Sequence, residues 1–115
     1  MRRGEIRLVD LDPARGNEAG KLRPAVVVSN DRANAPAART GRGVVTVVPV
    51  TSNVSRVHPF QVLIPEGGSG LRADSKAQAE QVRSVSVDRL GPALGRVPAD
   101  VMEQLDAALR LHLGL

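Results

Sequence analysis

An arginine at the start of an apolar strand is the residue of this sequence best placed to do chemistry. Arg23 directly precedes Pro24 and the valine triplet at residues 26–28. Proline restricts the residue before it to extended backbone, so Arg23 is constrained while its guanidinium can point out of a sheet. Glu18 and Lys21 lie nearby, at the end of a glycine-bearing loop. The pattern is compatible with an anion-binding site, although spacing alone favours a strand-end arginine that only solvates the sheet edge.

The composition excludes several other kinds of site. The chain has no cysteine and only two histidines, His58 and His112, which excludes thiolate nucleophiles, disulfide scaffolds and Cys- or His-rich metal clusters. Asp10 and Asp12 would share one face of a strand that continued that far, so they could form a metal pair. A polar strand edge followed by a turn explains them better, and we expect no metal and no other cofactor.

The charge distribution indicates a polyanionic partner. Sixteen Lys and Arg against twelve Asp and Glu give a net charge of +4, and residues 1–56 carry ten basic and five acidic groups. Fourteen of the cations are arginine, whose planar guanidinium binds phosphate in two-point contacts. Nucleic acid is the polyanion that this favours. A GC-rich coding bias, which enriches Arg, Ala, Gly, Val and Pro together, is the alternative.

The length of 115 residues fits one domain, spanning residues 1–115. No apolar run approaches the ~20 residues of a membrane span. Acidic residues interrupt the basic start, so no secretory signal can be read. We therefore expect a cytoplasmic protein without a membrane partner.

The hydrophobic pattern predicts a mainly β protein with one helix at its C-terminal end. Short apolar or alternating runs bounded by Gly, Pro, Asn and Asp are typical of strands, and the period becomes helical only near the end. The apolar phase slips near Glu80-Gln81, which predicts a β-bulge, and Pro49 predicts a bulge or an edge position. Strands are expected over residues 5–11, 24–29, 44–51, 60–64 and 75–85, a helix over 99–112, and loops over 12–23 and 30–43.

These elements predict a small, strongly bent antiparallel sheet or barrel. Phe60 is the only aromatic residue, so we expect it in the core, with stacking on a nucleobase as the alternative. His112 falls on the apolar stripe of the helix and is expected at a core edge or an interface. A core built from small aliphatic side chains leaves apolar surface that a second subunit would cover, which predicts a homodimer.

A set of motifs, in order along nearly the whole chain, resembles the MazF/PemK family of toxins. No single motif is specific, but the ordered set is. Arg7, where the family usually has an aromatic residue, and His58 depart from its pattern. The motifs are Arg3-Gly4-Glu5-Ile6, Val9-Asp10-Leu11-Asp12-Pro13, Gly16-Asn17-Glu18, Arg23 to Asn30, Val48 to Ser52, Pro59 to Val62, Asp74-Ser75, Ala79 to Ser84 and Gly95-Arg96-Val97.

The resemblance implies an SH3-like antiparallel barrel with a C-terminal α-helix, of the CcdB/PemK-like kind, acting as a homodimer. It implies a sequence-specific, metal-independent endoribonuclease toxin of a type II toxin–antitoxin system that cleaves single-stranded RNA, such as mRNA. It also implies a cognate MazE-like antitoxin whose acidic C-terminal tail lies across the RNA groove.

Carried over by position, the resemblance implies roles for individual residues. Arg23 and Thr51 match the catalytic arginine and threonine of the family, and Glu18 matches a loop glutamate of the active site. Glu80 and Gln81 match residues that read RNA base edges. The residues expected to bind RNA are Arg3, Lys21, Ser52, Asn53, His58, Ser75, Glu80, Gln81 and Arg83.

Cleaving RNA without a metal requires the 2′-oxygen to attack the adjacent phosphorus, giving 2′,3′-cyclic phosphate and 5′-hydroxyl ends. Arg23 suits charge stabilisation but is a poor base, and Thr51 can only offer a hydrogen bond. The general base is unassigned, with Glu18 a candidate and His58 a weaker one.

Two other functions are compatible with such a barrel, because fold alone does not fix function. A non-catalytic barrel would bind RNA with steep salt dependence and leave it intact. A CcdB-like gyrase poison would cleave nothing and would need a C-terminal tail, whereas this sequence has only three residues after His112.

Overall fold

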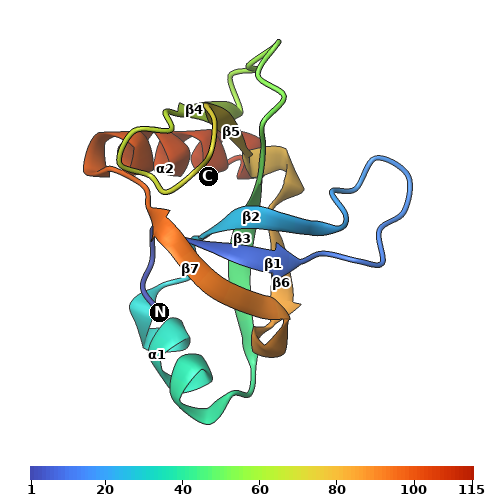
Figure 1. Cartoon of the computed structure of the whole chain (residues 1–115), viewed down its shortest axis with the longest axis vertical. Helices are drawn as coiled ribbons and strands as arrows, with labels where there is room; N and C mark the ends of the chain where they lie inside the picture. The colour runs from blue at the N-terminus through green and yellow to red at the C-terminus, as the bar shows by residue number, and fades with distance from the viewer.

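In the computed structural model, which describes residues 1–115, seven strands form one antiparallel sheet with an α-helix packed on each side of it (Figure 1). The strands are β1 (Glu5–Asp10), β2 (Leu22–Val27), β3 (Val44–Thr51), β4 (Gln61–Ile64), β5 (Ser75–Gln78), β6 (Arg83–Ser86) and β7 (Leu90–Arg96). The helices are α1 (Asp31–Thr40), α2 (Ala99–Leu113) and the short 3-10 turns η1 (Ala79–Gln81) and η2 (Val87–Arg89).

The order of the strands across the sheet is β4-β5-β3-β2-β1-β7, and β6 also pairs with β3. The predicted mainly β architecture with a C-terminal helix is confirmed. The sheet is strongly bent but not closed, because the edge strands β4 and β7 do not pair with each other. The expected barrel is therefore an open one.

A backbone contact between two glycines spans the gap that a closed barrel would fill with a ladder. A Cβ atom on Gly70 would lie 1.9 Å from the carbonyl oxygen of Leu94, and one on Gly95 would lie 2.0 Å from that of Ser69. Any larger residue would collide with the backbone, so glycine is required at both places. This contact seats the β4–β5 loop (residues 65–74) on strand β7.

Strand β3 has two successive partners along one edge, β6 and then β5. Val47 pairs with Arg83 of β6, and Val50 pairs with Ala77 of β5. Three residues of β3 therefore lie opposite six residues of the segment that runs from β5 to β6. The excess of three residues forms η1. The interruption expected at residues 80–81 is confirmed in place, but it is a 3-10 turn and not a one-residue bulge. Pro49 lies beside it, where no partner needs its missing N–H.

Helix α1 lies where the sequence predicted only a loop, so that prediction was wrong. The Asn30 side chain caps the helix by accepting the Ala33 N–H at 3.0 Å, and Gly41 ends it in the left-handed region at φ 68°. Both are ordinary helix boundary signals. Pro36 within the helix and the Gly41-Arg42-Gly43 run at its end obscured these signals.

Strand β7 was also not predicted. Its sequence, Leu-Gly-Pro-Ala-Leu-Gly-Arg, carries residues typical of turns, and it is tolerated because β7 is an edge strand whose pairing with β1 is irregular. The helix expected at residues 99–112 is confirmed as α2. Its buried positions are Val101, Leu105 and Ala108, whereas His112 is exposed.

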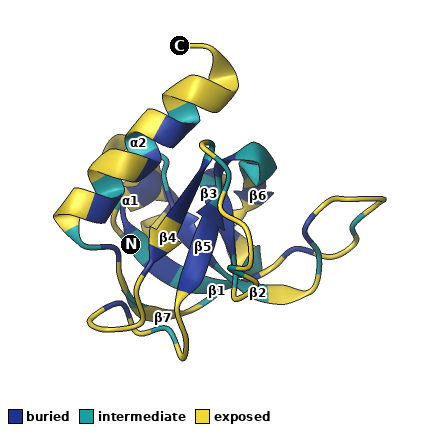
Figure 2. Ribbon diagram, turned by 90° about the horizontal axis from the view of Figure 1, so that it is seen from above, coloured by how far each residue is buried: buried dark blue, intermediate teal, exposed yellow.

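Two apolar clusters pack on opposite faces of the sheet. One contains twelve buried residues and includes the inner face of α2, and the other contains ten and includes Ala37 of α1. Figure 2 shows the buried strands beneath α2, whose outer side and C-terminal end are exposed. Neither helix has the length and apolar character to cross a bilayer.

The Asp31 carboxylate joins the N-terminal segment to α1. It accepts the Arg3 N–H at 2.8 Å and a longer bond from the Asn34 amide at 3.3 Å. These two hydrogen bonds, the first being the larger cause, lower the pKa of Asp31 below its ordinary value of 3.8. The interaction fixes the backbone of Arg3 against the start of α1.

The glycine contact between the β4–β5 loop and β7 predicts a specific loss of stability. Gly95→Ala should lower the free energy of unfolding by roughly 1–3 kcal/mol, because the new methyl group must displace backbone. Urea denaturation followed by circular dichroism measures this. Gly67→Ala is the matched control, since a Cβ there has no neighbour within 4 Å. Equal denaturation midpoints for the two variants would show that the contact contributes nothing.

Candidate active site

A groove of ≈ 680 Å³ opens where the start of β2, the end of β3 and the β4–β5 loop meet. Four residues expected to act on RNA line it together: Arg23, Thr51, Ser52 and Ser75. It contains no carboxylate. The complete lining is Leu8, Arg23, Pro24, Val50, Thr51, Ser52, Gly70, Leu71, Arg72, Ala73, Ser75 and Leu94.

The register of two buried strands brings Arg23 and Thr51 together. Strands β2 and β3 are antiparallel, with Ala25 opposite Pro49. The observed pairing ends there, and Arg23 and Thr51 lie two residues further along their strands, where both line the groove. Ala25 and Pro49 are both buried, so the two polar residues extend directly from a rigid core.

The Arg23 guanidinium is unusual among the arginines of this chain. Five arginines are half-buried, and four of them, Arg3, Arg7, Arg83 and Arg89, donate to a carboxylate or a backbone carbonyl. Arg23 makes neither a hydrogen bond nor an ion pair with the protein. Its donors are therefore free, at a partly desolvated position where an anion would satisfy them.

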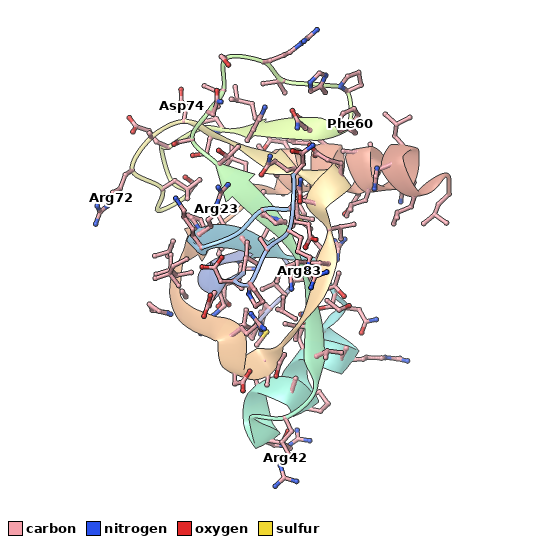
Figure 3. The ribbon with its side chains drawn as sticks, turned by 90° about the vertical axis from the view of Figure 1, so that its right-hand side faces the viewer. Arg23, Arg42, Phe60, Arg72, Asp74 and Arg83 are labelled. Carbon is pink, nitrogen blue, oxygen red and sulfur yellow. The ribbon has the colours of Figure 1, made fainter.

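Arg72 contributes a second guanidinium to the groove from the β4–β5 loop, and it was not singled out from the sequence. It is exposed and, like Arg23, has no partner in the protein. Figure 3 shows both arginines at a similar height toward the left side of the view, far from Arg42 at the bottom. Arg72 reaches the groove because the β4–β5 loop packs against β7 through the contact of Gly70 with Gly95. No local sequence signal predicts this long-range contact.

The hydroxyl groups in the groove differ in what they can still donate. Thr51 Oγ1 accepts the Asn53 N–H at 3.3 Å, which leaves its own hydrogen available to a ligand. The buried Ser75 donates its hydroxyl to the Ala73 carbonyl at 3.0 Å. Ser52 is exposed and has no hydrogen-bond partner in the protein. Thr51 and Ser52 are thus the hydroxyl donors free to meet a phosphate.

Buried polar side chains anchor the β3–β4 loop (residues 52–60) beside the groove. Lys76, a buried residue opposite Thr51 in β5, donates from Nζ to the Arg56 carbonyl at 2.5 Å. Gln61 accepts the His58 N–H at 3.1 Å and donates to Glu80 Oε2 at 2.6 Å. Glu80, expected to read a base, therefore lies outside the groove lining and supports the loop through Gln61.

Phe60 is half-buried and not a core residue, so the expected core position is wrong. Its ring stacks on that of His58, with centroids 5.1 Å apart and planes 5° from parallel. Phe60 precedes β4, so its ring need not lie on the buried face of the sheet. The alternating apolar pattern of residues 60–64 did not reveal this. The pair forms a flat ring surface next to the β3–β4 loop.

The β1–β2 loop (residues 11–21) carries Glu18 and Lys21, and both are exposed and outside the groove lining. The carboxylates of Asp10 and Asp12, weighed above as a metal pair, accept the Asp12 and Lys21 N–H groups at 3.1 and 2.7 Å. They order the base of the loop. Lys21 has φ 66°, a left-handed turn that leads directly into β2 and Arg23.

The remaining predicted residues lie around the groove or away from it. Gln81 and Arg83 hydrogen-bond to backbone of the β1–β2 loop. Asn53 accepts bonds from Ser55 within its own loop. Arg3 forms an ion pair with Asp106 of α2 at 2.7 Å and lines a different hollow.

Comparison with known proteins identifies the family of this chain. Residues 2–113 match the family described as PemK-like, MazF-like toxins of type II toxin–antitoxin systems. The chain belongs to this family. The resemblance drawn from the ordered motifs is thereby confirmed.

The MazF-like toxin is 65% identical to Endoribonuclease MazF9 of Mycobacterium tuberculosis over 115 residues, which cover 100% of this chain and 98% of that relative. Its structure is similar to that of MazF from Deinococcus radiodurans, with a TM-score of 0.81, 29% identity, and coverage of 100% of this chain and 97% of the other. The structure is also similar to that of a mycobacterial endoribonuclease in complex with its cognate antitoxin. The TM-score is 0.79, the sequence identity is 26%, and the match covers 100% of this chain and 96% of the other.

Proposed function

We propose that this toxin is a sequence-specific endoribonuclease that cleaves single-stranded RNA in the cytoplasm without a metal ion. The observation that carries the proposal is the free, half-buried guanidinium of Arg23 beside the Thr51 hydroxyl, in a groove that holds a second cation, Arg72. The high identity to Endoribonuclease MazF9 supports it. A phosphodiester is the anion whose charge and oxygen geometry suit such a pair of donors.

The groove suits an attack of the 2′-oxygen on the neighbouring phosphorus. The bond from O2′ to phosphorus forms while the bond to the 5′-oxygen breaks; O2′ gives up its proton to a base, and the leaving oxygen gains one. Negative charge grows on the phosphoryl oxygens in between, where Arg23 donates two hydrogen bonds and Thr51 one. Arg72 adds positive charge on the other wall. The products are a 2′,3′-cyclic phosphate and a 5′-hydroxyl.

The proton acceptor comes from outside the groove lining, which has neither a carboxylate nor an imidazole. Glu18 is the acceptor that we propose, because it lies on the loop that leads through Lys21 into Arg23. His58 is the weaker candidate: its ring is stacked on Phe60, on a surface better suited to a nucleobase.

We further propose that an acidic segment of a cognate antitoxin covers this groove. Two free guanidinium groups and no carboxylate line it, so carboxylate side chains can replace the phosphate. The similarity to a mycobacterial endoribonuclease solved in complex with its antitoxin supports this partner. The net charge of +4 favours the encounter.

We also propose that the toxin acts as a homodimer. The C-terminal turn of α2 and the start of β3 expose large apolar side chains, with Val44 62%, Leu113 53% and Leu115 87% exposed. These residues line a second hollow of ≈ 690 Å³, together with Leu109 and Val82. A second copy of the chain would remove this apolar area from water.

Replacing Arg23 tests the proposed chemistry. Arg23→Ala should reduce the rate of RNA cleavage on the order of 10²–10³-fold, because one preorganised donor to the developing charge is lost. Single-turnover cleavage of a defined transcript measures this. Arg42→Ala, which removes an exposed arginine at the other end of the molecule, is the control and should retain the wild-type rate. Near-normal cleavage by folded Arg23→Ala would refute the assignment.

The chemistry of the cut ends distinguishes the proposed function from its alternatives. Cleavage in EDTA should proceed at the full rate and give 2′,3′-cyclic phosphate and 5′-hydroxyl ends, measured by end-labelling and mass spectrometry. Loss of cleavage in the chelator would instead indicate a metal site formed by Asp10 and Asp12. RNA that is bound but intact would indicate a non-catalytic barrel, and gyrase inhibition without RNA cleavage would indicate a CcdB-like poison.

The apolar hollow at the end of α2 predicts the mass of the toxin in solution. Light scattering at micromolar concentration should give twice the 12.1 kDa of one chain. Leu113→Asp should shift the mass toward one chain, because a charge would be buried between the subunits. Leu63→Asp, a change at an exposed leucine of β4, should not. A single-chain mass for the wild type would contradict the dimer.

A further inference from the structure

We infer that Gln81 is a positioning residue, which holds the β1–β2 loop and its Glu18 in place. The inference rests on the proposed function for its catalytic consequence, but not for the structural part. The expectation from sequence was that Gln81 contacts base edges. Its hydrogen bonds indicate another role.

Both polar atoms of the Gln81 side chain are occupied by loop backbone. Oε1 accepts the N–H of Ala19 at 3.0 Å, and Nε2 donates to the carbonyl of Asn17 at 3.0 Å. Asn17 and Ala19 are the immediate neighbours of Glu18, so the Gln81 amide is hydrogen-bonded to the backbone on both sides of Glu18. The Ala19 side chain is buried in the apolar cluster below, which fixes the same point of the loop from within.

The base of the loop is held by the same segment of chain. Arg83 donates to the Leu11 carbonyl at 3.1 Å, and Arg89 donates to the carbonyl of Asp10 at 3.2 Å and also to that of Asp12. Residues 81–89 thus bind the β1–β2 loop near both of its ends. The positions between the anchored ends, residues 13–16, are largely exposed.

The outer part of the loop needs such anchoring because, apart from the Gln81 bonds, only a bond from the Glu18 N–H to the Arg15 carbonyl at 3.0 Å holds it. It projects from the sheet (Figure 1) and contains neither helix nor strand. Two glycines, Gly16 and Gly20, increase the conformational freedom that must be lost when it is fixed. The η1 turn, created by the excess residues opposite β3, is what brings Gln81 within reach of the loop. Without the Gln81 bonds, Glu18 would sample many positions relative to Arg23.

The two roles of Gln81 predict different results. A residue that reads a base must offer its amide to RNA, and Gln81, while it holds Asn17 and Ala19, has only the second lone pair of Oε1 and the second hydrogen of Nε2 left for this. Its loss would then change the preferred cut sequence and leave the loop unchanged. A positioning residue does the reverse: its loss frees the loop and slows cleavage at the same sequence.

Gln81→Met tests this, because methionine keeps the approximate size and has no amide. Hydrogen exchange of the Ala19 amide should become roughly tenfold faster, and trypsin should cut after Arg15 roughly tenfold faster. Cleavage of a random RNA pool should show a lower kcat at an unchanged cut sequence. Gln104→Met, at an exposed glutamine of α2, is the control and should change none of these.

Gln81→Glu provides a second variant should Gln81→Met fail to fold. It keeps an acceptor for the Ala19 N–H and places a carboxylate oxygen against the Asn17 carbonyl, so exchange at Ala19 should increase less than tryptic cutting at Arg15. Unchanged exchange and proteolysis in the folded variants would overturn the inference, as would a new cut sequence with the loop unaltered. If the wild type cleaves no RNA, the proposed function fails, and the exchange data still decide whether Gln81 holds the loop.

Discussion

The antiparallel register of β2 and β3 is the constraint on which the site depends. It places Arg23 beside Thr51 at the point where two buried strands reach the sheet edge. Because the residues behind them are packed in the core, the backbone that carries both side chains is already ordered before a ligand arrives. The other half-buried arginines are held by internal partners, and Arg23 alone keeps its donors free. A preorganised, unpaired cation is what stabilisation of a developing phosphoryl charge requires.

The rest of the fold supplies the walls of the groove around that fixed pair. The close contact of Gly70 with Gly95 takes the place of barrel closure and brings Arg72 to the opposite wall. Lys76 and Gln61 anchor the β3–β4 loop from beneath. The segment from η1 to η2 anchors the β1–β2 loop from the side. Polar side chains, buried or half-buried, thus order the two loops that flank a rigid centre.

Much of this arrangement could be predicted from the sequence where the signal is local. Arg23 before Pro24, the valine-rich strands and the helical period of α2 depend on neighbours along the chain. Arg72 and β7 could not be predicted in the same way, because only a distant backbone contact gives them their positions. Helix α1 had local signals in Asn30 and Gly41 that its breakers concealed. The change in the phase of the apolar pattern near Gln81 could be seen in the sequence. The number of extra residues could not, because it depends on β5 and β6 both pairing with β3.

The central claim is that the Arg23 guanidinium meets the scissile phosphate. A crystal structure with an RNA that carries a 2′-deoxy sugar at the cut site, and so cannot be cleaved, tests it most directly. The account predicts that phosphate in the groove, with Arg23 nitrogens about 2.7–2.9 Å from its oxygens and the Thr51 hydroxyl in contact with it. RNA bound with its cut-site phosphate outside the groove, and Arg23 directed to solvent, would contradict the account.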